Sequence, residues 1–137
     1  MLAKTENQET ILVVEDDVLV RMPISQYLRD CGYKIIEAVN ADEAMVVLLH
    51  RETPIDIVFS DIEMPGSIDG FGLPKWIREN HPGLDVILTG TLPRTVDSAQ
   101  KLCEQGPIPK PYDAQLVHNR IRRLLAARQG ANDQIEG

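Results

Sequence analysis

The chain contains 137 residues, which is enough for one ordinary domain with a hydrophobic core and too few for two. Lys and Arg number 14 against 21 Asp and Glu, so the formal charge of −7 excludes a broad basic face for nucleic acid or anionic lipid. Hydrophobic residues make up 43%, which excludes a disordered chain, and no apolar run is long enough to span a membrane. The two cysteines, Cys31 and Cys103, lack metal-ligand spacing, so we expect reduced thiols and a cytoplasmic location.

Two strand–helix units are predicted in the first part of the chain, after a polar segment. The continuous apolar run Thr10–Val14 is typical of a strand inside a covered parallel sheet. A helix over residues 18–31 follows, and Pro23 within it is expected to bend the helix or delay its start. A short strand over Lys34–Ala38 then leads to a helix that Asn40 can cap.

Three more units follow in the same alternation. Strands are predicted over 55–60, 84–88 and 107–109. Helices are predicted from a cap at Asp69 to the His81-Pro82-Gly83 stop, over 94–105, and over 113–128. The pattern therefore predicts one α/β domain over 10–128 with a parallel sheet covered on both faces, between flexible segments 1–9 and 129–137.

Polar residues follow four of these strands, at the edge where open α/β sheets bind ligands. They are Asp16, Asp17, Asp61, Thr89 and Lys110. Crowded carboxylates repel one another unless a cation lies among them, and oxygen ligands of this kind suit Mg²⁺. A carboxylate can also act as a nucleophile, with an ammonium and a hydroxyl to contact phosphoryl oxygens. This set of side chains indicates phosphoryl transfer onto an aspartate.

Four segments resemble the receiver domain of two-component response regulators. They are Val13-Val14-Glu15-Asp16-Asp17, Asp61-Ile62-Glu63-Met64-Pro65, Thr89-Gly90 and Lys110-Pro111-Tyr112. The resemblance covers residues 10–128 and implies a flavodoxin-like, doubly wound five-stranded sheet of order 2-1-3-4-5. It also implies a cis bond between Lys110 and Pro111.

The resemblance further implies a role for each site residue. Asp61 would accept a phosphoryl group from a phosphohistidine of a sensor histidine kinase or phosphotransfer protein. Asp17 and Asp61 would ligate Mg²⁺ directly, together with the backbone carbonyl of Glu63, while Asp16 would act through a metal-bound water. Lys110 would pair with the phosphoryl group or with Asp61.

Thr89 would move toward the phosphoryl group and switch the face formed by helix 4, strand 5 and helix 5. The chain departs from the family there, because Pro107 stands where many receivers carry a switch aromatic residue. The loop 64–70 is also one residue longer than the commonest pattern. These departures favour an atypical output switch.

Several alternatives remain open from the sequence. The chain could be a single-domain regulator, or a receiver cut from a hybrid kinase or a longer regulator. Less favoured are a pseudo-receiver that only binds proteins and a Mg²⁺-dependent phosphohydrolase. We expect no enzyme activity of its own, an unknown downstream protein partner, and a monomer or weak homodimer.

Overall fold

Strands and helices alternate along the chain, as the sequence predicts. The computed structural model describes residues 8–50, 52, 54–61, 72–90, 108 and 110–136, with only the backbone of 129–136. The elements are β1 (Thr10–Val14), α2 (Val18–Asp30), β2 (Lys34–Ala38), α3 (Ala41–Leu49), β3 (Ile57–Asp61), α4 (Gly72–Asn80), β4 (Asp85–Thr89) and α6 (Ala114–Glu136). The predicted helix over 94–105 lies outside the described residues.

The sheet is parallel and has the strand order β2-β1-β3-β4. Ile108 continues it beyond β4 through an isolated parallel bridge to Thr89. The Ile108 N–H donates to the Leu88 carbonyl at 2.8 Å, and the Gly90 N–H donates to the Ile108 carbonyl at 3.0 Å. Ile108 thus marks the fifth position, which confirms the predicted flavodoxin-like order 2-1-3-4-5.

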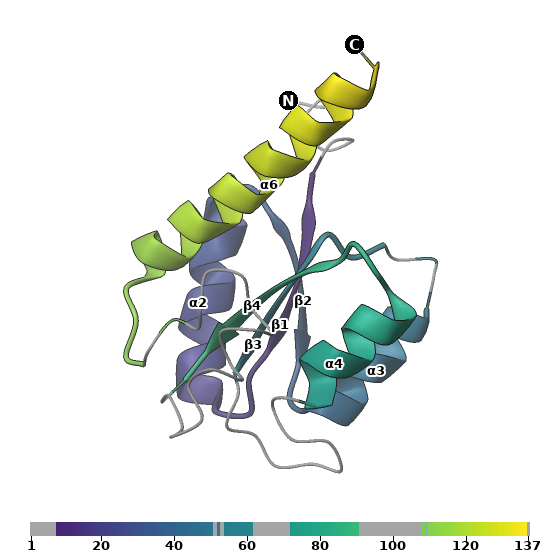
Figure 1. The fold of residues 1–137 in the computed structure, drawn as a ribbon. Helices are drawn as coiled ribbons and strands as arrows, with labels where there is room; N and C mark the ends of the chain where they lie inside the picture. The colour runs from purple at the N-terminus through teal and green to yellow at the C-terminus, as the bar shows by residue number, and fades with distance from the viewer. Residues whose placement is uncertain are drawn as a thin grey trace.

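Helices cover both faces of the sheet, with α2 and α6 on one face and α3 and α4 on the other (Figure 1). Alternate residues of β1 point into opposite layers, as the pleat of a strand requires. Ile11 and Val13 lie in the core beneath α2 and α6, while Leu12 and Val14 lie in the core beneath α3 and α4. All four side chains are buried, which explains why β1 is a continuous apolar run.

Two predicted strands are displaced toward the C-terminus by one or two residues. β3 was expected over 55–60 and β4 over 84–88, yet β3 ends at Asp61 and β4 ends at Thr89. The cause is pairing, because β3 and β4 run in register from Ile57 opposite Asp85 to Asp61 opposite Thr89. Both polar residues are therefore the last residues of strands rather than the first residues of loops.

The start of α2 agrees with the prediction, whereas the end of the final helix does not. α2 begins at Val18 as expected, so Pro23 does not delay its start. The final helix was expected to end at Arg128 but continues to Glu136. No proline occurs in this stretch, and Gly130 costs a helix only about 1 kcal/mol relative to alanine, so polarity alone did not end it.

The predicted cis bond between Lys110 and Pro111 is present. Among the residues that the structure describes, no helix is both long enough and apolar enough to cross a membrane.

Candidate functional site

The predicted polar residues meet at the carboxyl edge of the sheet. Asp61 and Thr89 end neighbouring strands and lie opposite each other in the β3–β4 register. Glu15 follows β1, the strand on the other side of β3. Lys110 follows Ile108 at the fifth strand position. Parallel strands present their ends at one edge, so four separate parts of the sequence form one site.

The peptide of Glu15 is fixed on both sides. Its N–H donates to the Ala38 carbonyl of β2 at 3.0 Å, and its carbonyl accepts from Arg21 Nη1 at 2.9 Å. Arg21 Nε in turn donates to Glu37 Oε1 at 3.0 Å. Arg29 Nη2 holds the other Glu37 oxygen at 3.1 Å. One arginine of α2 thereby ties the acidic loop after β1 to β2.

The Lys110 ammonium lies between two buried carboxylates. Nζ donates to Asp61 Oδ2 at 2.9 Å and lies 2.7 Å from Glu15 Oε1. Both carboxylate side chains are almost fully buried, at 2% exposure for Asp61 and 3% for Glu15. Burial alone would lower the pKa of Lys110, but its contacts with Glu15 and Asp61 outweigh burial and raise that pKa. Lys110 therefore stays charged at neutral pH.

The environment of Glu15 shifts its protonation toward neutral pH. Burial raises the pKa of its carboxyl to about 7, and the negative charge of Asp61 adds to the rise. Lys110 and the Asp17 N–H, which donates to Oε2 at 3.0 Å, only partly oppose this. Two buried acids that share one partly buried ammonium are an arrangement that favours a further cation.

The acidic cluster fits a divalent metal. Glu15, Asp16 and Asp61 each offer one carboxylate oxygen, and these oxygens all lie within 4.8 Å of one another. Asp16 is exposed, while the other two are buried, so one side of the cluster faces solvent. Oxygen ligands with room for water match Mg²⁺, which keeps several waters and takes one or two carboxylates. The residues present therefore fit the expected ion.

The structure does not bring Asp17 into this cluster. Asp17 caps α2 instead, because its Oδ1 accepts from the Leu19 N–H at 3.0 Å. Glu15 lies in the cluster where we expected Asp17. One signal could have revealed this: an acid directly before a helix is the usual N-cap, which leaves the two acids before it for the site. The Glu63 carbonyl lies outside the described residues.

Thr89 is at the site with an unused hydroxyl. Its side chain is fully buried, and Oγ1 has no hydrogen-bond partner within the part of the chain described above. A buried hydroxyl without a partner is unfavourable, so it is available to a group that enters the site. Pro107, expected to replace a switch aromatic, lies outside the described residues.

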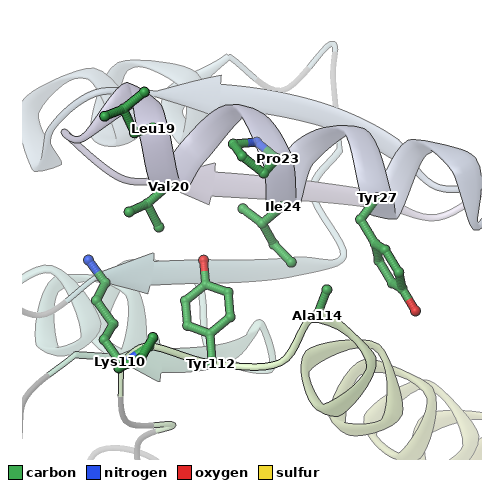
Figure 2. Close-up of a pocket in the computed structure, with 9 residues that line it drawn as sticks. Leu19, Val20, Pro23, Ile24, Tyr27, Lys110, Tyr112 and Ala114 are labelled. Carbon is green, nitrogen blue, oxygen red and sulfur yellow. The ribbon is translucent and has the colours of Figure 1, made fainter.

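A pocket of about 560 Å³ adjoins Lys110 on the α2 side of the site (Figure 2). It is mostly apolar and lies between α2 and the chain that leads into α6. Its lining residues are Leu19, Val20, Pro23, Ile24, Tyr27, Lys110, Pro111, Tyr112 and Ala114. The site thus opens beside an apolar surface as well as to solvent.

Comparison with known proteins agrees with this geometry. The sequence model of the response regulator receiver domain matches residues 11–122. The chain is 33% identical over 134 residues to the DNA-binding transcriptional regulator NtrC of Salmonella typhimurium, covering 93% of this chain and 28% of that protein. The chain therefore spans little more than a quarter of that relative's length.

Solved receiver structures superpose well. NtrX from Brucella abortus matches with a TM-score of 0.80 at 27% identity, over 94% of this chain and 29% of that one. The receiver domain of the hybrid histidine kinase CckA matches with a TM-score of 0.68 at 31% identity, over 85% of this chain and 98% of that one. The family match, the sheet order and the acid–lysine site lead to one conclusion: this chain belongs to the response regulator receiver domain family.

Proposed function

We propose that this chain accepts a phosphoryl group on Asp61 in a Mg²⁺-dependent reaction. The observation that carries the proposal is the buried Asp61 carboxylate, held at 2.9 Å by Lys110 within an acidic, metal-compatible cluster. The phosphodonor is a phosphohistidine on a sensor histidine kinase or phosphotransfer protein. Receiver domains are in general signalling modules rather than enzymes, and we propose no turnover of an independent substrate.

Phosphoryl transfer would form one bond to phosphorus and break one. An Asp61 oxygen forms a bond to phosphorus while the bond from phosphorus to the histidine nitrogen breaks. The electron pair returns to the imidazole, which takes a proton from solvent. Lys110 is placed to offset negative charge on the transferred group, and the Thr89 hydroxyl can donate to one of its oxygens.

We assign the metal to Glu15, Asp16 and Asp61, with the Glu63 carbonyl still an expected ligand. When bound, Mg²⁺ would neutralise charge on the carboxylates and on the phosphoryl oxygens. Lys110 already balances part of the charge on the two buried acids. The metal would supply the charge that the described residues lack for a phosphoryl group with further negative oxygens.

The phosphodonor protein would dock on the start of α2. Leu19 and Met22 are 81% and 60% exposed, which is unusual for large apolar side chains in a row along one helix. Leu19 also lines the pocket beside Lys110. A partner that covers these side chains would bring its phosphohistidine close to Asp61.

Output would follow from Thr89, which we propose turns toward the phosphoryl group. The face it would switch includes the helix predicted over 94–105, which lies outside the described residues. The relatives carry receivers within larger proteins, among them a transcriptional regulator and the sensor kinase CckA of Brucella abortus. Whether this receiver works alone or within such a chain sets its downstream partner.

Incubation with acetyl phosphate and Mg²⁺ tests the proposal. We expect the intact mass to rise by one phosphoryl group, and peptide mapping to place that group on Asp61. Asp61→Asn removes the nucleophile and should abolish the gain, while a chelator should abolish it in the wild type. Asp56→Asn is a matched control, because Asp56 pairs with Arg128 away from the site.

A mass gain that persists in Asp61→Asn would refute the assignment. Absence of any gain, with phosphodonor kinase as well as acetyl phosphate, would instead favour a pseudo-receiver. Continuous release of phosphate from small phosphate esters would favour a phosphohydrolase.

A further inference from the structure

Tyr112 lies beside the site, and its hydroxyl is unused. The ring packs edge-on against Phe59 of β3, with ring centroids 5.6 Å apart and an interplanar angle of 82°. The hydroxyl oxygen is buried and has no hydrogen-bond partner within the described part of the chain. In Figure 2 the Tyr112 hydroxyl and the Lys110 ammonium project side by side toward α2. A buried O–H group without a partner lowers the stability of the state in which it occurs.

A matching acceptor lies in the same cluster. Glu15 Oε1 is buried and accepts no hydrogen bond of good geometry, although Lys110 Nζ lies 2.7 Å away as an ion pair. Glu15 and Asp61 both raise the pKa of the Tyr112 hydroxyl, while Lys110 lowers it. Burial is the largest cause of the net rise in that pKa, so the phenol stays protonated and remains a donor at neutral pH. The hydroxyl is thus within electrostatic reach of all three charged groups.

Lys110 has two partners at rest and would have a third after phosphorylation. It now bridges Glu15 and Asp61 at 2.7 and 2.9 Å. A phosphoryl group on Asp61 would add negative charge and draw the ammonium toward it. Glu15 Oε1 would then lose its ammonium donor while still buried. A metal ion on the same carboxylate would still leave a lone pair on this oxygen, and a buried oxygen that accepts no hydrogen bond is unfavourable.

We propose that Tyr112 is a positioning residue whose hydroxyl hydrogen-bonds Glu15 when Lys110 turns from Glu15 to the phosphoryl group on Asp61. The inference rests on the proposed phosphoacceptor function. It assigns Tyr112 a task in the phosphorylated state and none in the resting state. The hydroxyl releases Lys110 to the phosphoryl group by replacing it at Glu15.

The variant Tyr112→Phe tests this, because it removes one oxygen and keeps the ring against Phe59. At saturating Mg²⁺, we expect the rate constant for phosphorylation by acetyl phosphate to fall about tenfold, as for loss of one hydrogen bond to a charged group. The thermal midpoint of the unphosphorylated variant should be equal to or above that of the wild type, because the lost hydroxyl had no partner there. A purely structural role for the hydroxyl would lower that midpoint instead.

Tyr33→Phe is the matched control. Its hydroxyl is bonded to His118 Nε2 at 3.1 Å, away from the acidic cluster, so phosphorylation should proceed at the wild-type rate. An unchanged phosphorylation rate in Tyr112→Phe would overturn the inference, as would a lower midpoint of the unphosphorylated variant. Failure of the wild type itself to be phosphorylated would refute the proposed function, and so the two failures are distinct.

Discussion

Glu15 links the chemistry of the site to pH. Its carboxyl has a pKa of about 7 in the folded protein, against an ordinary value of 4.5. Between these values the folded state binds more protons than the unfolded chain, so this group makes the metal-free protein less stable as pH rises through that window. A metal ion, in contrast, needs the deprotonated carboxylate.

We therefore expect Mg²⁺ affinity to rise with pH and to level off above about pH 7. Below the pKa, each unit of pH should weaken binding by about tenfold, because the fraction of deprotonated Glu15 falls tenfold. Calorimetric titration with Mg²⁺ between about pH 5.5 and about pH 8 measures this dependence. In Glu15→Gln the slope over this range should disappear, and a slope that persists there would assign the titration to another group.

At the scale of elements, the start of α2 separates two acids that are adjacent in sequence. Asp17 accepts from the Leu19 N–H and caps the helix, whereas Asp16 contributes an oxygen to the acidic cluster. Neighbouring residues thus have different tasks because the helix begins between Asp17 and Val18. Substitutions at the two positions should have separable effects.

We expect Asp17→Ala to lower the free energy of unfolding by about 1 kcal/mol through loss of the cap. Asp17→Asn should retain most of that stability, because asparagine caps helices as well as aspartate does. Mg²⁺ affinity should change little in Asp17→Asn but fall by about tenfold or more in Asp16→Asn. Denaturant titration and calorimetry measure the two quantities. Equal losses of Mg²⁺ affinity at both positions would restore Asp17 as a ligand.

The sequence allowed most elements to be located, because their signals are local. Thr10–Val14 is apolar on both faces, and this pattern identifies a covered strand without any structure. Strand ends were less predictable, since Asp61 and Thr89 belong to strands only through pairing between β3 and β4. The sequence of one segment alone does not reveal where its pairing with another strand ends.

Most residues of the site could also be predicted from the sequence, but not all. Asp61, Thr89 and Lys110 each follow a predicted strand, and they meet as expected. Glu15 was missed because three consecutive acids offer two possible registers, and only the helix start decides between them. The role of the Tyr112 hydroxyl could not be predicted from sequence. The proposed role depends on the burial of the hydroxyl and on its lack of a partner in the described part of the chain.

At the scale of the whole molecule, metal binding should stabilise the fold. The acidic cluster joins groups that follow or end different strands, so an ion bound there stabilises the folded state and not the unfolded chain. At a Mg²⁺ concentration about 100 times Kd, we expect a gain of about 2.7 kcal/mol and a Tm higher by roughly 10 °C. Differential scanning calorimetry with and without Mg²⁺ measures the gain. A chelator should reverse it, and an equal rise with NaCl at matched ionic strength would contradict a specific site.

Among the residues that the structure describes, the sheet also divides the buried apolar side chains into two separate layers. Side chains beneath α3 and α4 do not touch those beneath α2 and α6, because β1, β3 and their neighbours stand between them. Mutations in one layer are therefore largely independent of those in the other. Over evolutionary time, the helices that border the apolar pocket beside Lys110 can diverge to recognise new partners while the opposite layer continues to preserve the fold.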